Sequence, residues 1–225
     1  MKPNIVAIPV LALLIRISAG CASNAQVPGA ANLADNGGFE KWVPAPKQIL
    51  GVPWCPQLPD GLPDAWPLPS VLGHPDATGV IACDSSVDHG GEHSLRITNG
   101  NPANIVDITQ CVGVDPDARY LVKIWVKGDH VGPSGGATIH IIGSSDNNKT
   151  DGNLWAGAIA GMDIYKSPTP NNGTFDWTEM TFPVDALPHA RELKITLQLR
   201  NATGTLWYDD VEVRKVERII HVESY

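Results

Sequence analysis

Residues 192–201, ELKITLQLRN, alternate strictly between apolar and polar side chains. The apolar set consists of Leu193, Ile195, Leu197 and Leu199, and the polar set of Lys194, Thr196, Gln198 and Arg200. Successive side chains of a β-strand point to opposite faces of the sheet. The period of two therefore predicts a strand with one face on an apolar core and the other face in water.

Similar runs, rich in β-branched and aromatic residues, fill the chain from Val80 onward, and clusters of Gly, Pro, Asn and Asp separate them. They are GVIAC (79–83), HSLRIT (93–98), NIVDITQCVGV (104–114), RYLVKIWVKG (119–128), ATIHIIGS (137–144), FDWTEMTFPV (175–184) and TLWYDDVEVRKV (205–216). No stretch of a dozen residues has a helical period. The pattern predicts an all-β domain, a two-sheet antiparallel β-sandwich of the jelly-roll type.

The amino-terminal residues have the composition of an export signal. Lys2 precedes IVAIPVLALLI (5–15), an apolar run long enough for a signal-peptide core and too short to span a bilayer. Small residues before Gln26 fit cleavage there, whereas ISAGC (17–21) resembles a lipoprotein signal that ends before Cys21. We predict a bacterial protein that is secreted, or is held at the outer membrane as a lipoprotein, without a transmembrane segment after processing.

The expected organisation has four parts. Residues 1–25 are the signal, residues 26–34 a linker, residues 35–216 the sandwich, and residues 217–225 a tail. Within the sandwich, the Pro-rich segment 43–76 is expected to be an ordered loop, because Trp54 and Trp66 supply apolar anchors.

Charge and cysteine content restrict the functions that remain. The chain has 16 Lys and Arg against 24 Asp and Glu, a formal charge of -8, which argues against nucleic acid and anionic membrane surfaces as partners. Cys55, Cys83 and Cys111 are an odd number for an oxidising compartment, so one pair could form and leave one thiol. Which pair would form is not readable from the sequence.

Two adjacent carboxylates interrupt the apolar pattern of the last strand, LWYDDVEV (206–213). One of Asp209 and Asp210 must point toward the side that the apolar residues cover, and a carboxylate there costs several kcal/mol unless a partner meets it. A cross-strand pair with Arg214 or Lys215 is one solution.

Several segments, in order, resemble a known family. They are NGGFEKW (36–42), PDAWPL (63–68), DHGGEHSLRI (88–97), DITQCVGVDPDARYLVKIWVKG (107–128), GTFDWTEMTFPV (173–184) and GTLWYDDVEV (204–213). Together they resemble the landmarks of the secreted carbohydrate-binding modules of families 4, 9, 16 and 22, which are jelly rolls. The resemblance covers residues 35 to 216.

The resemblance implies a structural calcium ion between the first and last strands. In this sequence the matching positions are Glu40, Asp209 and the segment 88–92, with Asp88 and Glu92 as candidate ligands. Calcium takes six to eight oxygen ligands, so acids gathered from distant parts of the chain suit it. The family pattern HSG reads here as His89, Gly90 and Gly91, which departs from it.

Exposed aromatic rings are the first requirement of a polysaccharide site, because sugar rings offer flat apolar faces. Trp125 lies between two lysines on the face opposite Val122 and Ile124, where it is either a sugar platform or covered by a loop. Trp155, in the Gly- and Asn-rich GNLWAG, is a candidate for a loop-borne ring, and Tyr165 and Trp54 are further candidates.

Polar candidates come from the predicted wet faces of the strands. Gln198, Arg200 and His140 lie on such faces, and Gln110 matches a glutamine of the family's landmark motif. Each also has a structural alternative: a surface ion pair for Arg200, a solvated strand residue for His140, and satisfaction of backbone groups for the amides.

Three functions remain open at this point. The first is non-catalytic binding of a β-glucan, xylan or related plant or algal polysaccharide, with a separately encoded glycoside hydrolase as a companion. The second is a small jelly-roll glycoside hydrolase or polysaccharide lyase, for which Asp107, Asp129, Asp163 and Glu179 are the available acids. The third is a cell-envelope adhesion or protein-interaction domain.

Overall fold

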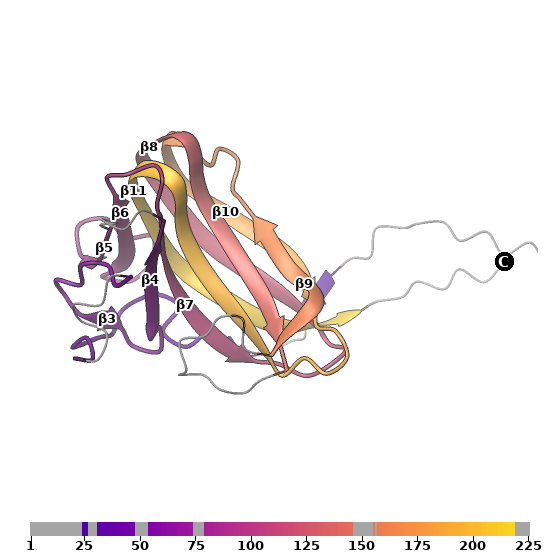
Figure 1. Cartoon of the computed structure of the whole chain (residues 1–225). Helices are drawn as coiled ribbons and strands as arrows, with labels where there is room; N and C mark the ends of the chain where they lie inside the picture. The colour runs from indigo at the N-terminus through magenta and orange to yellow at the C-terminus, as the bar shows by residue number, and fades with distance from the viewer. Residues whose placement is uncertain are drawn as a thin grey trace, which may run out of the picture.

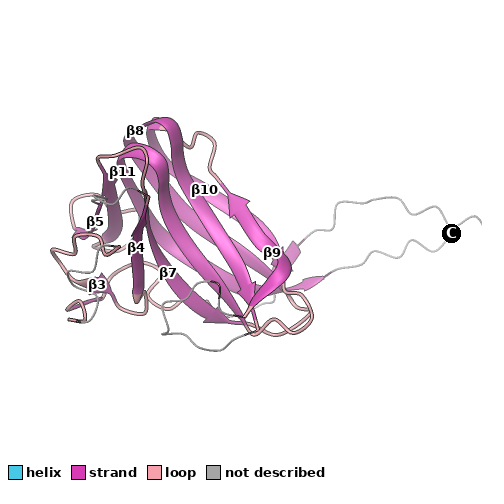
Figure 2. Cartoon of the chain, in the orientation of Figure 1, coloured by secondary structure: helices cyan, strands magenta, loops and turns pink. Residues whose placement is uncertain are grey.

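The computed structural model describes residues 24–26, 31–47, 54–73, 79–145, 155 and 157–218. These residues form strands and loops and no helix, as Figure 2 shows. Accordingly, no helix in these ranges could cross a membrane. The strands are β1 (Asn24–Gln26), β2 (Trp42–Val43), β3 (Leu62–Pro63), β4 (Leu68–Leu72), β5 (Gly79–Asp84), β6 (Ser94–Asn99), β7 (Ile105–Gly113), β8 (Arg119–Ser144), β9 (Ala158–Lys166), β10 (Gly173–Asp185) and β11 (Glu192–Arg218). The all-β prediction is confirmed.

The two longest strands, β8 and β11, belong to both layers of the molecule. Layer A has the strand order β4-β7-β11-β8-β9 and uses the second part of β8 and the first part of β11. Layer B has the order β5-β6-β11-β8-β10 and uses the other parts of β8 and β11. The paired strands are antiparallel, and β2 and β3 form a small separate sheet.

β8 and β11 pass together from one layer to the other, at the top of the view in Figure 1. The register between them shifts at Arg200/Ala202 and again at Thr203/Thr205. Gly204 lies in this bend with a φ of 109°, a conformation that side chains with a Cβ rarely adopt. As a result, the runs 119–128 and 137–144, predicted as two strands, are the two ends of one.

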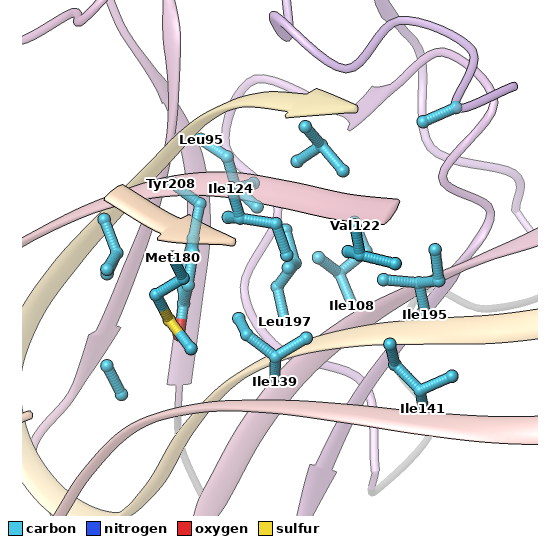
Figure 3. Close-up of a cluster of buried hydrophobic side chains, with 14 of the residues drawn as sticks. Leu95, Ile108, Val122, Ile124, Ile139, Ile141, Met180, Ile195, Leu197 and Tyr208 are labelled. Atoms are coloured by element: carbon cyan, nitrogen blue, oxygen red, sulfur yellow. The ribbon is translucent and has the colours of Figure 1, made fainter. Parts of the chain in front are cut away.

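The apolar core fills the space between the layers. The alternating leucines and isoleucine of residues 193–199 are fully buried, as the sequence pattern predicts. Figure 3 shows Ile108, Ile139, Ile141, Ile195 and Leu197 from layer A with Leu95, Val122, Ile124, Met180 and Tyr208 from layer B. Tyr208 is fully buried, and its hydroxyl is satisfied because it donates a hydrogen bond of 2.7 Å to the Gln198 carbonyl oxygen.

Two strands of layer A were not expected from the sequence. β4 lies inside the Pro-rich segment, at the edge of the layer, where Pro69 is tolerated. β9 lies at the opposite edge, and its sequence AIAGMDIYK has no strict alternation. These edge strands complete the face on which the candidate site is built.

The amino-terminal part of the fold begins earlier than residue 35. Asn24–Gln26, at the predicted signal cleavage site, pair with residues 216–218 of β11. In the predicted linker, the Asn32 amide donates to the Val211 carbonyl oxygen and its carbonyl oxygen accepts from Val213 N–H. Residues 31–34 are therefore joined to the last strand by hydrogen bonds rather than forming a free linker. Residues 1–23, which carry the rest of the predicted signal, lie outside the described residues.

The described cysteines do not form a disulfide. Cys55, Cys83 and Cys111 are partly buried, and none of the three is in a disulfide. Burial raises the pKa of both Cys55 and Cys83. The pair that the sequence left open is therefore not formed, and Cys21 lies outside the described residues.

Candidate functional site

The side of layer A that faces away from the core, here called the polar face, carries polar side chains in rows across its strands. One row consists of Ser70, Asp107, Gln198 and Thr138, from β4, β7, β11 and β8. The next consists of Thr109, Thr196, His140 and Tyr165, from β7, β11, β8 and β9. The alternation in each strand places these residues on one face, because neighbouring positions point into the core.

Much of the polar face is buried, contrary to the wet face predicted for residues 192–201. Lys194, Thr196 and Gln198 are each at most 3% exposed. The side chains contact one another: the hydroxyls of Thr109 on β7 and Thr196 on β11 are 2.7 Å apart, and within β11 Lys194 Nζ lies 3.5 Å from Glu192 Oε1. The sequence pattern correctly predicted which way these side chains point, but it wrongly predicted that they are exposed. Exposure depends on which other parts of the chain cover the face, and the local pattern does not contain that information.

Asp107 is the most perturbed acid of this face. Ser70 Oγ donates to one of its oxygens at 2.6 Å and the Gln198 amide donates to the other at 3.2 Å. Burial raises the pKa of Asp107 to about 7, because these two hydrogen bonds and the charge of Arg200 only partly offset the loss of solvent. Gln198 Oε1 is also buried, and it has no hydrogen-bond partner among the described residues.

Exposed rings border the polar face at the β9 edge. Tyr165 is 46% exposed and stacks on His140, with ring centroids 4.0 Å apart. His140 is hydrogen-bonded to Asp163 at 2.6 Å, and the Trp155 ring, in a residue that is 58% exposed, lies 6.0 Å from the His140 ring. Arg200 lies over Tyr165, with Cζ 5.1 Å from the ring centroid. Four of the predicted ligand-binding residues therefore meet here.

At the β4 edge, Trp54 is 57% exposed. Its carbonyl oxygen accepts the N–H of Val71, which fixes it beside β4. Leu72, in the same strand, points to the polar face and is also exposed. The face thus has apolar groups at both edges and a polar floor between them.

Two predicted ligand-binding residues lie elsewhere. Gln110 is on the core side of β7, where its amide donates to the Asp35 and Ala65 carbonyl oxygens and its own oxygen accepts from Asp35 N–H. Trp125 lies on the outer face of layer B, stacked under His89 with ring centroids 3.9 Å apart. Gln110 therefore ties down the amino-terminal loops, and Trp125 is covered by a loop, the alternative that the sequence had left open.

Sequence reasoning missed the smaller members of the polar floor, Ser70, Thr109 and Thr196. A signal for Thr109 was present, because it lies two residues from Asp107 and must share its face. Ser70 had no such signal, since β4 itself was not predicted.

A second group of acids lies where the last strand meets the turn 88–92. Asp209 is fully buried, and its oxygens accept N–H groups from His89 (2.8 Å), Gly90 (3.0 Å) and Asp210 (2.7 Å). Burial raises the pKa of Asp209 to about 6 despite these bonds. The inward carboxylate is therefore met by the backbone of a distant turn, and not by Arg214 or Lys215, the cross-strand alternative.

Glu40 meets the same turn. Its carboxylate accepts the N–H groups of Glu92 (2.9 Å) and His93 (3.3 Å). Burial opposes ionisation of Glu40, but these hydrogen bonds and the contact with the His93 ring outweigh it and lower its pKa. The side chains of Asp88 and Glu92, also predicted as metal ligands, point to solvent.

Glu40, Asp209 and Asp210, here called the acid corner, have side chains that suit calcium, although in this structure Glu40 and Asp209 accept hydrogen bonds from the backbone of the turn 88–92 and its neighbours. A Cβ on Gly38 would lie 3.9 Å from one oxygen of Asp209 and one of Asp210, and 3.9 Å from Cγ of Glu40. These carboxylates are the hard oxygen donors that calcium prefers. Within the described ranges, however, no three His, Cys, Asp or Glu side chains are grouped as a metal site.

Comparison with known proteins finds similarity in structure alone. No protein-family model matches the sequence, and no curated protein matches it. Among solved structures, the enzymatically active domain of tailspike protein 4 of bacteriophage CBA120 superposes with a TM-score of 0.54 at 14% identity, over 82% of this chain and 21% of that one. The chain thus spans about a fifth of the tailspike domain.

Carbohydrate-binding modules are also among the similar structures. A tandem of family 22 modules from Paenibacillus barcinonensis Xyn10C has a TM-score of 0.49 at 14% identity, over 87% of this chain and 47% of that one. A family 4 module has a TM-score of 0.48 at 16% identity, over 80% of this chain and 98% of that one. Modules of families 16 and 61 are found as well, the latter in complex with β-1,4-galactotriose. The β-sandwich predicted from the sequence is confirmed by the two antiparallel layers of this chain.

Proposed function

We propose that the protein is a non-catalytic polysaccharide-binding module and that the polar face is its binding surface. The observation that carries the proposal is the meeting of His140, Tyr165, Trp155 and Arg200 at one edge of a floor of polar side chains. Exposed rings stack on the apolar faces of sugars, and the polar groups beside them hydrogen-bond to the hydroxyls.

Each edge of the face has a distinct role in this proposal. Trp155 and Tyr165 supply ring surface, and Arg200 and Asp163 supply a charged donor and acceptor for sugar hydroxyls. Trp54, at the β4 edge, would contact a second part of a bound chain. Asp107, Thr109, Thr196 and Gln198 hold the strands of the floor in register beneath these groups.

Affinity electrophoresis tests the proposal. The purified protein is run in native gels that contain xylan, mixed-linkage glucan, laminarin, mannan or alginate. Retardation by at least one polymer is expected, and a Trp155→Ala, Tyr165→Ala double variant should lose most of it, since each stacked ring contributes about 0.5–1.5 kcal/mol beyond its buried area. Val43→Ala, which removes an exposed side chain of β2, is the matched control and should migrate as the wild type.

Retardation by none of these polymers would contradict the proposal. Equal retardation of the double variant and the wild type would leave polysaccharide binding standing but would move it from the polar face. Thermal melts of each variant separate lost binding from lost folding.

A glycoside hydrolase or lyase on the same face is the second candidate. The observation that favours it is the pKa of Asp107, which burial raises to about 7, although this side chain is only 1% exposed. Release of reducing ends or of unsaturated uronates from the retarding polymer, lost in Asp107→Asn, would establish an enzyme. Binding without any release favours the module.

We propose further that Glu40 and Asp209, with Asp210 beside them, would hold the structural calcium ion that the sequence resemblance implies. A Cβ on Gly38 would be 3.9 Å from an oxygen of Asp209, an oxygen of Asp210 and Cγ of Glu40, so the three side chains meet there. A bound ion would supply positive charge to three acids of which Asp209 is fully buried.

Export and partners remain part of the proposal. The signal-like residues lie outside the described ranges, so secretion or a lipid anchor at Cys21 rests on the sequence. A separately encoded glycoside hydrolase would be a fitting companion for a polysaccharide-binding module.

A further inference from the structure

A small hollow opens on the outer face of layer B, on the opposite side of the sandwich from the polar face. It has a volume of about 280 Å³ and a mostly apolar lining. Trp207 supplies the ring at its wall, the buried Phe175 closes its floor, and Lys127, Asp129, Thr174 and Asp176 supply polar groups. We call it the Trp207 hollow.

The Trp207 ring is fixed in orientation. Its Nε1–H donates to Asp84 Oδ2 at 2.9 Å, and the same oxygen accepts from Arg96 at 3.2 Å. Burial opposes ionisation of Asp84, but the hydrogen bonds from Trp207 and Ser86 and the charge of Arg96 outweigh it and lower its pKa, so a charged acceptor holds the indole edge. With its edge anchored, the ring can offer a flat face at little entropic cost.

The strand beneath the hollow carries a glycine at residue 128. Any Cβ on Gly128 would overlap the Phe175 ring, which packs directly against the strand. Gly128 is paired with Leu206 in β11 and with Phe175 in β10, so the two rings come from strands on either side of β8. This close approach places Phe175 at the floor of the hollow and Trp207 beside it.

Polar groups next to the rings are solvated and already act as donors and acceptors. Lys127 Nζ lies 2.7 Å from Asp176 Oδ1, and Thr174 Oγ1 donates to Asp129 at 3.2 Å. The Asp176 side chain is 85% exposed, so its contacts can be exchanged for those of a ligand at low cost.

We propose that the Trp207 hollow is a second carbohydrate-binding site, which takes a single sugar ring. The Trp207 ring and the adjacent charged and hydroxyl groups match the two requirements of sugar recognition, stacking and hydrogen bonding. Its volume is below the ~300–1,000 Å³ of pockets that enclose a larger ligand, which limits it to one ring. The proposal rests on the glycan-binding function for its ligand class, but uses none of the residues of the polar face.

A consequence is that one molecule would bridge two polysaccharide chains. Two sites on opposite faces cannot lie on the same stretch of one chain, so binding would cross-link the polymer.

The test uses the polymer that retards the wild type most in native gels, with four forms of the full protein. In the Trp155→Ala, Tyr165→Ala double variant, residual retardation is expected from the hollow. Adding Trp207→Ala to this double variant should abolish the remaining retardation. Trp207→Ala alone should keep retardation but lose the turbidity that a cross-linking protein produces with a soluble polymer.

Lys127→Ala serves as the second variant, because it removes a polar group of the hollow without touching the Asp84 anchor. It should reduce the turbidity at least several-fold while the melting temperature stays near that of the wild type. Arg191→Ala, at an exposed residue outside both sites, is the control and should leave turbidity unchanged.

The outcomes separate the two proposals. Complete loss of retardation in the polar-face double variant, or unchanged turbidity in Trp207→Ala, overturns the second site and leaves the first. Absence of retardation of the wild type by any polymer overturns both.

Discussion

Asp107 shows how a single buried carboxyl group links the stability of the protein to pH. Its pKa is about 7 in the folded chain, against about 3.9 in an unfolded one. Between these values the folded state binds the proton and the unfolded state does not, so the free energy of unfolding falls as pH rises from about 4 to 7. Asp209, with a pKa of about 6, acts in the same direction over a narrower range.

We therefore predict that the protein is more stable at pH 5.5 than at pH 8, with a slope of at most about 1.4 kcal/mol per pH unit for each carboxyl. Asp107→Asn, which cannot ionise, should flatten the slope above about pH 6 and match or exceed the wild type in stability at pH 8. Its new amide N–H could also donate to Gln198 Oε1. Urea unfolding at several pH values measures both effects, and a wild-type stability that rises from pH 5.5 to 8 would contradict them.

At the scale of elements, the polar floor joins strands by side-chain hydrogen bonds as well as by the backbone. The Thr109 and Thr196 hydroxyls bridge β7 and β11 in a fully buried position. A buried hydroxyl that loses its partner keeps its desolvation cost, whereas replacing both partners by apolar groups of the same shape removes that cost.

We expect Thr196→Val to lower the free energy of unfolding by about 1–3 kcal/mol, because Thr109 is left unsatisfied. The Thr109→Val, Thr196→Val double variant should cost less than the sum of the two single variants. A double-mutant cycle in denaturant measures the coupling, and strict additivity would show that the two hydroxyls do not act as a pair.

The sequence predicted the direction of strand side chains better than their surroundings. Residues 193–199 show why direction is predictable: a strand's period of two depends only on local geometry. Exposure is not local, so Gln198 and Thr196 are buried although their pattern predicted solvent. Trp125 was placed on the correct face, but its cover, His89, comes from a turn distant in sequence.

The sequence also did not show that the predicted strands 119–128 and 137–144 are two ends of one strand, β8. The bends in β8 and β11 involve His130 and Asn201 with positive φ, a conformation that these residue types adopt more often than most but that their presence alone does not predict. The candidate site could be predicted in its rings and in His140 and Arg200. Ser70 of its floor could not, because it belongs to the floor only through the pairing of β4 with β7.

For the whole molecule, the acid corner gives a test of the proposed calcium ion. An ion bound only by the folded state stabilises it by about 2.7 kcal/mol at a hundredfold excess over Kd, and chelation should then lower Tm by several degrees. Asp209→Asn should abolish this response, whereas Asp115→Asn, an exposed acid paired with Lys215, should retain it. A melting curve that EDTA leaves unchanged would count against calcium.

The continuity of β8 and β11 through both layers has a mechanical consequence. If the outer faces of the two layers hold separate polysaccharide chains, tension between those chains pulls the layers apart. In a sandwich joined only by its core, such a load would fall on side-chain packing. Here covalent backbone crosses from one layer to the other twice, at the bends near His130 and Gly204, and carries part of the force. A protein built in this way would yield by straightening two strands rather than by opening its core.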